Sequence, residues 1–479
     1  MNLSGDVAID RDALLATLPP EWPKDLFPEI RERVQAPGTK VVVLDDDPTG
    51  TQTVHHLWVL TRWSPDALRF ALSDPSPMFY VLHNSRSLPE ASAAALNQEI
   101  VANLTAITDE LGCDFELLSR SDSTLRGHFP AEIDALRAVL RPCLGRDYDG
   151  IVICPFFSEG GRLTIGDIHW VIDGDLLIPA GQTEYARDVA FGYTNSNLRH
   201  WVAEKTGGRV PADDVASISL GTIREEGPAG VRQILERVTD AQVIVVNAAS
   251  YRDLEVFVAG LLDAEEAGKR YLLRTAASLA KVRGGVPDQD LLSREQMLGA
   301  RRGPGLILVG SYVHKTTRQL ERARALEGLV AVELSVPQVL DPIGRPVAVV
   351  EAAARATEAM LNDCEALIYT SRELVTDRGR AGDLDVGQQV SAALLEVVRR
   401  VGAVPSYLIA KGGITASDIA TGGLGVERAW VLGQILPGVP VWRLGPESRF
   451  PDLPYVVFPG NVGDDESLAE AMRLLRPAR

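Results

Sequence analysis

The sequence predicts an α/β fold of two domains, each a mostly parallel sheet flanked by helices, with the active site in the cleft between the domains. Short apolar runs alternate with helical patterns along most of the chain, which is typical of parallel sheets covered by helices. The alternation stops between Lys281 and Pro304, where glycine, proline and charged residues concentrate. We therefore expect one domain on each side of that break.

The amino-terminal half contains apolar runs that read as buried parallel strands, with helical patterns between them. Helices are predicted at 90–111 and 130–140, and Pro130 suits a first helical position because no backbone N–H is needed there. The predicted strands cover residues 40–44, 79–82, 115–118, 151–154 and 243–246.

The carboxyl-terminal half repeats this alternation. Strands are predicted at 306–309, 366–369, 407–410 and 455–458, and helices near 316–326, 351–362 and 386–401. Residues 1–38 are rich in proline and show little periodicity, so they are expected to form a peripheral extension. The expected division is an extension at 1–38, a domain at 39–285, a linker at 286–304 and a second domain at 305–479.

Composition excludes several classes of protein. The net charge is −17, whereas a protein that neutralises phosphates of nucleic acid or of an anionic membrane should be basic. The apolar runs are far shorter than the ~20 residues of a membrane helix, and the first residues show no signal peptide. The 4 cysteines lie far apart without a CxxC pair, which fits a reducing cytoplasm. We expect a cytoplasmic protein with no nucleic-acid or membrane partner.

Three carboxylates, Asp45, Asp46 and Asp47, follow the strand predicted at 40–44. In open α/β sheets ligands bind at the carboxyl ends of the strands. Adjacent like charges repel, and a cation or a proton-bearing substrate can compensate for that repulsion. The sequence therefore indicates a ligand site, although a solvated turn before Pro-Thr-Gly remains an alternative.

Two further polar loops follow predicted strands. The loop at 117–127 carries Arg120, Asp122 and Arg126 among several hydroxyl groups, and the loop at 83–87 carries Arg86. Arginine binds a carboxylate through two parallel hydrogen bonds, and hydroxyl groups suit a polyol, so a hydroxy acid is a fitting ligand. The alternative is that these arginines pair with nearby acidic residues on the surface.

Three glycine-containing turns lie in the carboxyl-terminal half, at 309–312, 407–420 and 458–468. Glycine allows the backbone to approach a ligand closely, and exposed N–H groups at a helix start attract phosphate. Such turns also occur as plain connections, but three in one domain favour a nucleotide. The fingerprints of P-loop, dinucleotide-binding, zinc-protease and serine-hydrolase sites are absent. The sequence thus predicts group transfer between a nucleotide and a small polar substrate.

These elements together resemble the four-carbon acid sugar kinase family, ATP-dependent kinases of tetronates such as threonate, erythronate and 3-oxo-tetronate. The resemblance covers residues from about 39 to 470 and depends on the order and spacing of short motifs. The amino-terminal motifs are Asp-Asp-Pro-Thr-Gly at 46–50, Asn-Ser-Arg-Ser at 84–87, Ser-Asp-Ser-Thr-Leu-Arg-Gly at 121–127 and Gly-Arg-Leu-Thr-Ile-Gly-Asp at 161–167. The carboxyl-terminal motifs are Gly-Ser at 310–311, Lys-Gly-Gly-Ile-Thr at 411–415 and Gly-Asn-Val-Gly at 460–463.

The resemblance implies a sugar-acid domain at 39–285 and a nucleotide domain at 305–479, with ATP and Mg²⁺ as cofactors. It implies that the partner is a small sugar acid, and the sequence leaves room for a homo-oligomer. Substrate binding is implied for Asp46, Arg86, Arg120, Ser121, Asp122, Ser123 and Arg126. Contact with ATP is implied for Ser311, Gly412, Gly413, Ile414, Thr415, Gly460 and Asn461.

The expected reaction transfers the γ-phosphoryl group of ATP to the terminal hydroxyl of the sugar acid. Positioning and electrostatics dominate such transfers, because the charge of a loose transition state is spread over the phosphoryl oxygens. Asp46 and Asp47 are the candidate catalytic residues. Asp45 and Asp47 are the candidate Mg²⁺ ligands, and the sequence leaves open which aspartate serves as base and which binds metal.

Two other functions compete with a kinase. Asp45 and Asp47 fit the DxDxT pattern of haloacid-dehalogenase-like phosphatases, as nucleophile and acid, and Lys411, Asp464 and Asp465 could supply the later motifs. Those motifs would then be spread across the predicted domain boundary, and the arginine loop would have no role. A non-catalytic sugar-acid sensor is the second alternative, although the sequence offers no basic surface for DNA.

Overall fold

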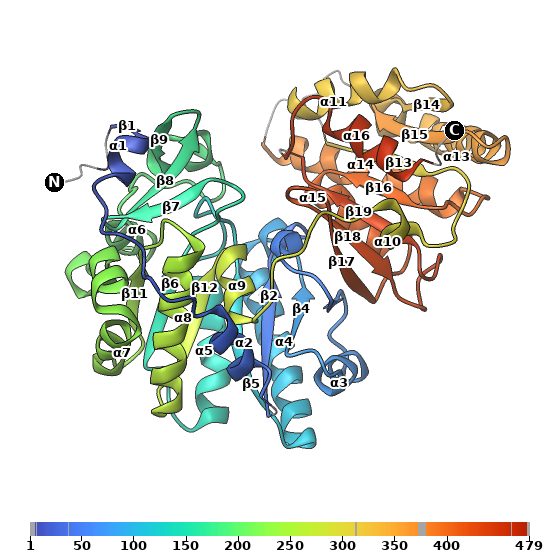
Figure 1. The fold of residues 1–479 in the computed structure, drawn as a ribbon. Helices are drawn as coiled ribbons and strands as arrows, with labels where there is room; N and C mark the ends of the chain where they lie inside the picture. The colour runs from blue at the N-terminus through green and yellow to red at the C-terminus, as the bar shows by residue number, and fades with distance from the viewer. Residues whose placement is uncertain are drawn as a thin grey trace. The chain divides into compact units, whose positions relative to one another are not determined.

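The computed structural model describes residues 5, 7–36, 38–311, 314–371, 380–460 and 462–476. The chain divides into two compact units: unit 1 comprises Met1–Gly50 and Arg62–Asp288, and unit 2 comprises Thr51–Thr61 and Gln289–Arg479. In Figure 1 the carboxyl-terminal part of unit 2 is drawn in orange and red. Both units contain a mostly parallel sheet flanked by helices, which confirms the predicted α/β fold. Within the described ranges, no helix has the length and apolarity needed to cross a bilayer.

Unit 1 contains a parallel sheet in the order β10-β11-β6-β12-β5-β2-β4. Each strand predicted in this half is present, within one or two residues at its ends. The strands are β2 (Thr39–Asp45), β4 (Met78–Leu82), β5 (Asp114–Arg120), β6 (Gly150–Cys154), β10 (Ala216–Ile218), β11 (Gln242–Val246) and β12 (Tyr271–Thr275).

Helices pack along this sheet in separate groups, with α4 against α5 and α7 against α8. The predicted helix at 90–111 is confirmed as α4, which ends at Gly112, a residue in the left-handed conformation (φ 64°) that favours glycine. The helices of unit 1 are α1 (Arg11–Leu15), α2 (Phe27–Val34), α3 (Pro65–Ser73), α4 (Glu90–Leu111), α5 (Ala131–Leu144), α6 (Leu198–Lys205), α7 (Gly227–Arg237), α8 (Tyr251–Glu266) and α9 (Ala277–Arg283).

A small antiparallel sheet of order β1-β9-β8-β7 also belongs to unit 1. Its strands are β1 (Ile9–Asp10), β7 (Arg162–Ile165), β8 (Ile168–Asp173) and β9 (Leu176–Pro179). The first residues of the chain are therefore better integrated than a peripheral extension: β1 completes this sheet, and α2 packs against α8 and α9 with Ile30 fully buried. The prolines of this region obscured its short elements in the sequence.

Unit 2 contains a sheet of order β3-β17-β18-β19-β16-β13-β15-β14. The strands from β19 to β14 are parallel, and β3, β17 and β18 add antiparallel pairs at one end. Strand β3 comes from the segment Thr51–Thr61, which the sequence placed in the amino-terminal domain. The strands are β3 (Leu57–Leu60), β13 (Leu306–Val309), β14 (Leu329–Leu334), β15 (Glu365–Thr370), β16 (Leu408–Lys411), β17 (Arg428–Leu436), β18 (Val439–Leu444) and β19 (Pro454–Phe458).

The region predicted as a linker, 286–304, contains the helix α10, whose Met297 and Leu298 are buried in the core of unit 2. The three predicted carboxyl-terminal helices are present as α11, α13 and α14. The helices are α10 (Arg294–Leu298), α11 (His314–Arg324), α12 (Val336–Leu340), α13 (Gly344–Leu361), α14 (Arg380–Arg400), α15 (Gly413–Asp418) and α16 (Ser467–Leu475).

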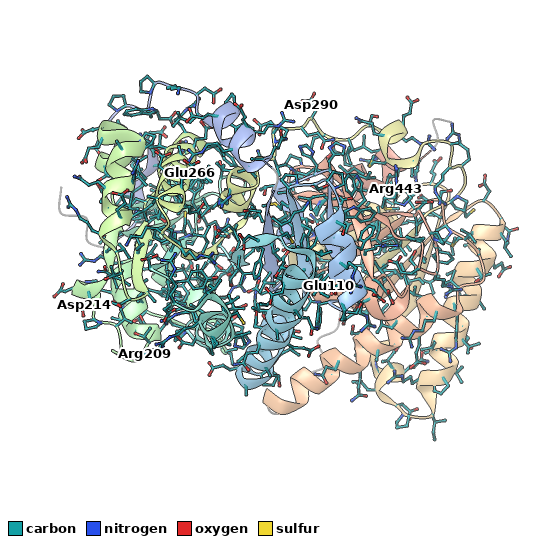
Figure 2. All side chains as sticks on the ribbon, turned by 90° about the horizontal axis from the view of Figure 1, so that it is seen from below. Glu110, Arg209, Asp214, Glu266, Asp290 and Arg443 are labelled. Carbon is teal, nitrogen blue, oxygen red and sulfur yellow. The ribbon has the colours of Figure 1, made fainter. Side chains whose placement is uncertain are left out.

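Charged side chains extend from the outer surfaces of the helices and loops in both units, as the composition predicts for a folded chain of this charge. Figure 2 shows examples at Glu110, Asp214 and Glu266 of unit 1 and at Asp290 of unit 2. The charged residues of greater interest are the few that are buried at the ends of strands.

Candidate functional site

The predicted substrate residues of unit 1 come together because their strands are neighbours. Strands β12, β5, β2 and β4 are adjacent and parallel, so their carboxyl ends lie at one edge of the sheet. Asp46 follows β2, Arg86 follows β4, and Ser121 follows β5. The structure therefore assembles the aspartate loop and both arginine loops into one cluster.

Asp46 lies at the centre of this cluster. Arg86 binds it in a fork, with Nη2 at 2.6 Å from Oδ1 and Nε at 3.2 Å from Oδ2. Ser121 Oγ donates to Oδ2 over 2.7 Å. Burial would raise the pKa of Asp46, but Arg86, Arg120 and Ser121 lower it below its usual value. Asp46 is thus a fully bonded anion that holds Arg86 in one orientation.

Asp45 is enclosed rather than available. Its Oδ1 accepts from Arg120 Nη1 at 3.0 Å, and a Cβ placed on Gly50 would lie 1.9 Å from its Oδ2. Burial raises the pKa of Asp45 to about 7, although Arg120 opposes the rise. Position 50 therefore requires glycine, and Asp45 is almost fully shielded from solvent, with 2% of its side chain exposed.

Asp47 is the accessible carboxylate of the three, with 22% of its side chain exposed against 2% for Asp45. Its Oδ1 accepts from the backbone N–H of Thr49 at 2.9 Å, and its Oδ2 lies 3.5 Å from Arg86 Nη1. One carboxylate oxygen is therefore oriented by the turn, and the other faces the arginine cluster.

Asp122 and Arg126 form a further ion pair within the loop after β5, with Arg126 Nε 2.8 Å from Asp122 Oδ2. Burial would raise the pKa of Asp122, but Arg86 and Arg126 lower it well below its usual range. The backbone of this loop is braced from the rest of unit 1: the carbonyl of Ser123 is 2.7 Å from a ring nitrogen of His169 in β8. The small antiparallel sheet thus helps to position the loop.

The sequence did not identify two buried residues of this cluster, Arg274 on β12 and Glu132 in the first turn of α5. They are 3% and 1% exposed, respectively. Arg274 Nη2 donates to Ser121 Oγ at 3.1 Å. Arg274 interrupts the apolar run of its strand, which hid both the strand and the residue, and Glu132 follows the regular acidic pattern of a first helical turn.

The predicted nucleotide residues of unit 2 also meet at one edge, because β13, β16 and β19 are adjacent and parallel. Thr316 Oγ1, in α11, lies 3.2 Å from Ser311 Oγ and 3.0 Å from the carbonyl of Gly460. The backbone N–H of Gly412 donates to the carbonyl of Phe458 over 2.8 Å. The turns after the three strands are thus tied together.

Two glycines of unit 2 are required by close packing. Gly412 has φ 120°, and a Cβ there would lie 3.1 Å from Ser311 Cβ and 3.1 Å from Thr415 Oγ1. A Cβ on Gly310 would lie 2.4 Å from Thr415 Oγ1. Backbone and hydroxyl groups therefore crowd this edge, and such a cradle admits a phosphate close to main-chain N–H groups.

Lys411 lies beneath this turn and is fully buried. Its Nζ donates to the carbonyl of Pro459 over 2.5 Å and lies 4.0 Å from the centre of the Phe458 ring. Burial, with a smaller effect from Lys315, lowers the pKa of Lys411 to about 6. Of the other predicted residues, Gly413 and Thr415 lie in the first turn of α15, and Asn461 and the side chain of Ile414 fall outside what the structure describes.

No group of three or more His, Cys, Asp or Glu side chains in the described part of the chain is placed to hold a metal ion. The predicted ligand Asp45 is also enclosed, as shown above. Of the two predicted metal ligands, Asp47 is the carboxylate that a hydrated cation could reach from solvent.

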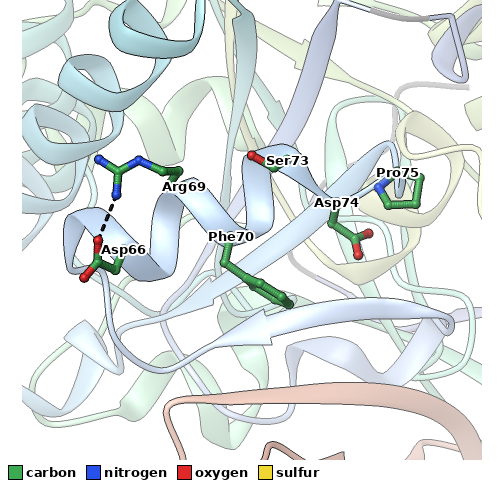
Figure 3. Close-up of a pocket in the computed structure, with 6 residues that line it drawn as sticks. All are labelled: Asp66, Arg69, Phe70, Ser73, Asp74 and Pro75. Atoms are coloured by element: carbon green, nitrogen blue, oxygen red, sulfur yellow. Dashed lines mark hydrogen bonds and ion pairs between the residues drawn. The ribbon is translucent and has the colours of Figure 1, made fainter.

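A surface hollow of about 510 Å³ lies elsewhere in unit 1, along α3 and the residues that follow it (Figure 3). Its arginine, Arg69, is already paired with Asp66 at 2.8 Å and with Glu110 at 2.9 Å. Asp74 and Pro75 precede β4 and so lie at the amino ends of the strands, away from the cluster at their carboxyl ends. This hollow takes no part in the candidate site.

Comparison with known families divides the chain at the same region. The model of a sugar-binding N-terminal domain matches residues 41–283, and that of a nucleotide-binding C-terminal domain matches residues 306–468. The charged cluster lies within the first match, and the glycine turns lie within the second.

Relatives of known activity are similar over long stretches. The chain is 28% identical to a D-threonate kinase of Bordetella bronchiseptica over 92% of this chain and 99% of the relative. It is 28% identical to a D-erythronate kinase of Heliobacterium modesticaldum over 47% of this chain and 46% of the relative. A crystal structure of a protein from Salmonella typhimurium LT2 shares the fold, with a TM-score of 0.66 at 18% identity, over 91% of this chain and 99% of that chain.

Proposed function

The chain belongs to the four-carbon acid sugar kinase family, and we propose that it transfers the γ-phosphoryl group of ATP to the terminal hydroxyl of a four-carbon sugar acid. Threonate and erythronate are the substrates named for its relatives. The observation that carries the proposal is the cluster of arginines around Asp46 in the segment that matches a sugar-binding domain.

The solvent-facing arginines of this cluster suit a carboxylate. Arg86 and Arg126 keep 16% and 26% of their side chains exposed, whereas Arg120 keeps 7% and is paired with Asp45. A guanidinium group binds a planar carboxylate bidentately. We assign Arg86 and Arg126 to the acid group of the substrate, and the hydroxyl group of Ser123 to its polyol.

Asp47 is the best placed base for the acceptor hydroxyl, because it combines an accessible carboxylate with an orienting hydrogen bond from Thr49. Asp46 is better suited to hold Arg86 than to accept a proton, since its oxygens are already bonded. The competing phosphatase needs Asp45 as nucleophile, and the enclosure of Asp45 beneath Gly50 opposes that role.

The turns at Ser311, Gly412 and Gly460 suit the phosphates of ATP, because they follow adjacent parallel strands and the Thr316 hydroxyl group ties two of them together. Bound Mg²⁺ would offset the charge of the phosphate oxygens. The absence of a protein metal cluster in the described residues favours entry of Mg²⁺ with the nucleotide rather than into a preformed site.

A coupled assay of ADP release with Mg²⁺-ATP tests this function across four- to six-carbon sugar acids. We expect ADP formation that depends on a four-carbon acid such as threonate or erythronate. The matched control is threitol, which keeps the hydroxyl groups but lacks the carboxylate that the arginines bind. Threitol should give little or no ADP.

The same assay separates the alternatives. Phosphate release from a sugar phosphate without nucleotide would establish the phosphatase. Binding of a sugar acid by calorimetry without any turnover would establish a sensor. ADP release that is independent of every acid tested would contradict the proposed kinase.

A further inference from the structure

A second layer of charge lies beneath the residues assigned to the sugar acid. Arg274 lies on β12, where it is paired with Ser119 of β5 and Ile153 of β6, and it is 3% exposed. Glu132 is 1% exposed, and neither of its carboxyl oxygens has a hydrogen-bond partner. Within the described residues, neither side chain has an ion-pair partner within 4.0 Å. Buried charged groups that lack hydrogen bonds or ion pairs of this kind require an explanation.

Aromatic packing fixes the guanidinium of Arg274. Its centre lies 5.4 Å from the ring of Phe129 and 5.5 Å from the ring of Trp201, and these two rings stack at 4.9 Å. A guanidinium group packs favourably against aromatic faces. Arg274 therefore has one orientation, and in that orientation Nη2 points at the loop after β5.

The hydrogen bond from Arg274 determines which acceptor receives the proton of the Ser121 hydroxyl group. Arginine donates and never accepts, so Ser121 Oγ must accept from Arg274 Nη2 at 3.1 Å. The hydroxyl then has one proton to donate, and the anion Asp46 Oδ2 at 2.7 Å is closer than the carbonyl of Arg126 at 3.2 Å. The result is a directed chain of bonds from Arg274 through Ser121 to Asp46.

The last link of this chain is Arg86. Both oxygens of Asp46 bind the guanidinium of Arg86, and Ser121 fixes the same carboxylate from the other side. The remaining nitrogen of Arg86, Nη1, lies 3.5 Å from Asp47 and 3.7 Å from Asp122, so it faces the open part of the cluster. The orientation of Arg86 therefore depends on Asp46, Ser121 and Arg274, which are 2%, 0% and 3% exposed.

We propose that Arg274 is a positioning residue for the sugar acid, which acts through Ser121 and Asp46 to hold Arg86 in the orientation that binds the substrate carboxylate. Among the acidic groups, Glu132 has the largest electrostatic effect on Arg274, ahead of Asp46 and Asp122. This inference rests on the proposed function, because it assigns Arg86 to the sugar acid.

A double-mutant cycle on Arg274→Gln and Ser121→Ala tests the proposal. The measured quantity is the dissociation constant for threonate and erythronate by calorimetry, with KM for ATP and kcat measured in parallel. Each single variant should weaken acid binding by about 10- to 100-fold, as expected for a lost hydrogen bond within a charged network. In the Ser121→Ala background, Arg274→Gln should add less than about a threefold further loss, because its route to Asp46 is already broken.

Further variants separate positioning from a structural role. Arg274→Lys keeps a charge and a donor and should restore part of the affinity lost in Arg274→Gln. KM for ATP should stay within about twofold of the wild type in every variant. The matched control is Arg283→Gln, which removes another buried arginine of unit 1 that pairs with Glu265 at 2.9 Å. It should lower the melting temperature without changing acid binding.

The outcomes are distinct. Losses that multiply in the double variant, unchanged acid binding in Arg274→Gln, or parallel changes in both substrates would each overturn the positioning role. If Arg274→Gln does not fold, Arg274→Lys alone and combined with Ser121→Ala completes the same cycle. If the wild type binds acid but produces no ADP, the kinase proposal fails while the cycle still tests Arg274. If the wild type binds neither acid, both proposals fail.

Discussion

The candidate ligand regions of unit 1 and unit 2 are built from different chemical groups at equivalent positions of their sheets. Both lie at the carboxyl ends of adjacent parallel strands. In unit 1 these ends carry ionised side chains that bind one another, such as Asp46 with Arg86. In unit 2 they carry glycines and hydroxyl groups, and the buried Lys411 bonds to main-chain carbonyls. The same sheet geometry thus presents side-chain charge in one unit and backbone polarity in the other.

This difference has consequences for recognition. A site made of side chains can discriminate among acids by the spacing of its arginines, and each substitution changes its charge. A site made of backbone depends on the room that glycine leaves, so it is damaged by adding atoms rather than by removing them. Substitutions in the unit 1 cluster should therefore change binding of the sugar acid, and an added Cβ at a unit 2 turn should weaken binding of the nucleotide.

Asp47→Asn should have the largest effect. The amide cannot accept the hydroxyl proton, so kcat should fall by about 10²- to 10⁴-fold, with ATP binding unchanged. Steady-state kinetics with a saturating sugar acid measure this loss. The control Asp66→Asn removes a surface carboxylate of α3 in the same unit and should leave kcat unchanged. A kcat near that of the wild type in Asp47→Asn would remove Asp47 from the role of base.

Gly412→Ala tests the backbone character of unit 2. The new Cβ would meet Ser311 and Thr415 at 3.1 Å, and alanine is strained at φ 120°. KM for ATP should rise by about tenfold or more, equivalent to one or two kcal/mol of lost contact, while acid binding is unchanged. Steady-state kinetics at varied ATP concentration measure the change in KM for ATP, and calorimetry measures binding of the sugar acid.

The matched control for this variant is Gly425→Ala, because Gly425 also has positive φ (66°) but has no atom within 4 Å of a new Cβ. It should lower stability by about 1 kcal/mol through backbone strain and leave KM for ATP unchanged. Equal changes in KM for the two variants would mean that strain, rather than crowding at the turn, determines nucleotide binding.

Lys411→Met tests how the buried charge of unit 2 responds to pH. The pKa of Lys411 falls from 10.5 to about 6 in the folded chain, so the unfolded chain binds more protons between these values. Wild-type stability should therefore rise with pH across this window, and the variant should lose that rise. Melting temperatures between pH 6 and pH 9 measure the slope. An unchanged slope would show that Lys411 keeps its proton in the folded protein.

The parts of the fold that the sequence predicted well are its apolar strands and long helices. Parallel strands buried on both faces read as continuous apolar runs, and α4 has both a periodic pattern and a glycine at its end. The strand β12 was not predicted, because Arg274 interrupts its apolar run. Strand β3 was placed in the amino-terminal domain because nothing local indicates that Thr51–Thr61 joins unit 2, where it pairs with β17.

The candidate site divides in the same way. Asp46, Arg86 and Ser121 could be predicted to meet, because each follows a strand whose carboxyl end faces one edge of a parallel sheet. The different environments of the three aspartates could not be predicted, since they depend on Gly50 packing over Asp45 and on the fork of Arg86. Three adjacent residues of the same type thus acquire separate roles through packing contacts that cannot be read from the local sequence.

Glu132→Gln should affect stability rather than catalysis or ATP binding, and it contrasts directly with Lys411→Met. Burial, and after it the charge of Asp46, raise the pKa of Glu132 from 4.5 to about 7, although Arg274, Arg86 and Asn97 lower it in part. The folded chain then binds more protons than the unfolded chain between these values, so this group lowers stability as pH rises through the window. The glutamine does not titrate, so the free energy of unfolding of Glu132→Gln should rise by about 1–3 kcal/mol relative to the wild type between pH 4.5 and pH 8.

Urea unfolding at pH 4.5 and pH 8 measures this gain in stability. The control is Glu110→Gln, on the exposed end of α4, which should leave the wild-type pH dependence unchanged between pH 5 and pH 8. A wild-type pH dependence retained in Glu132→Gln would place the responsible proton elsewhere, with Asp45 as the next buried carboxyl to substitute.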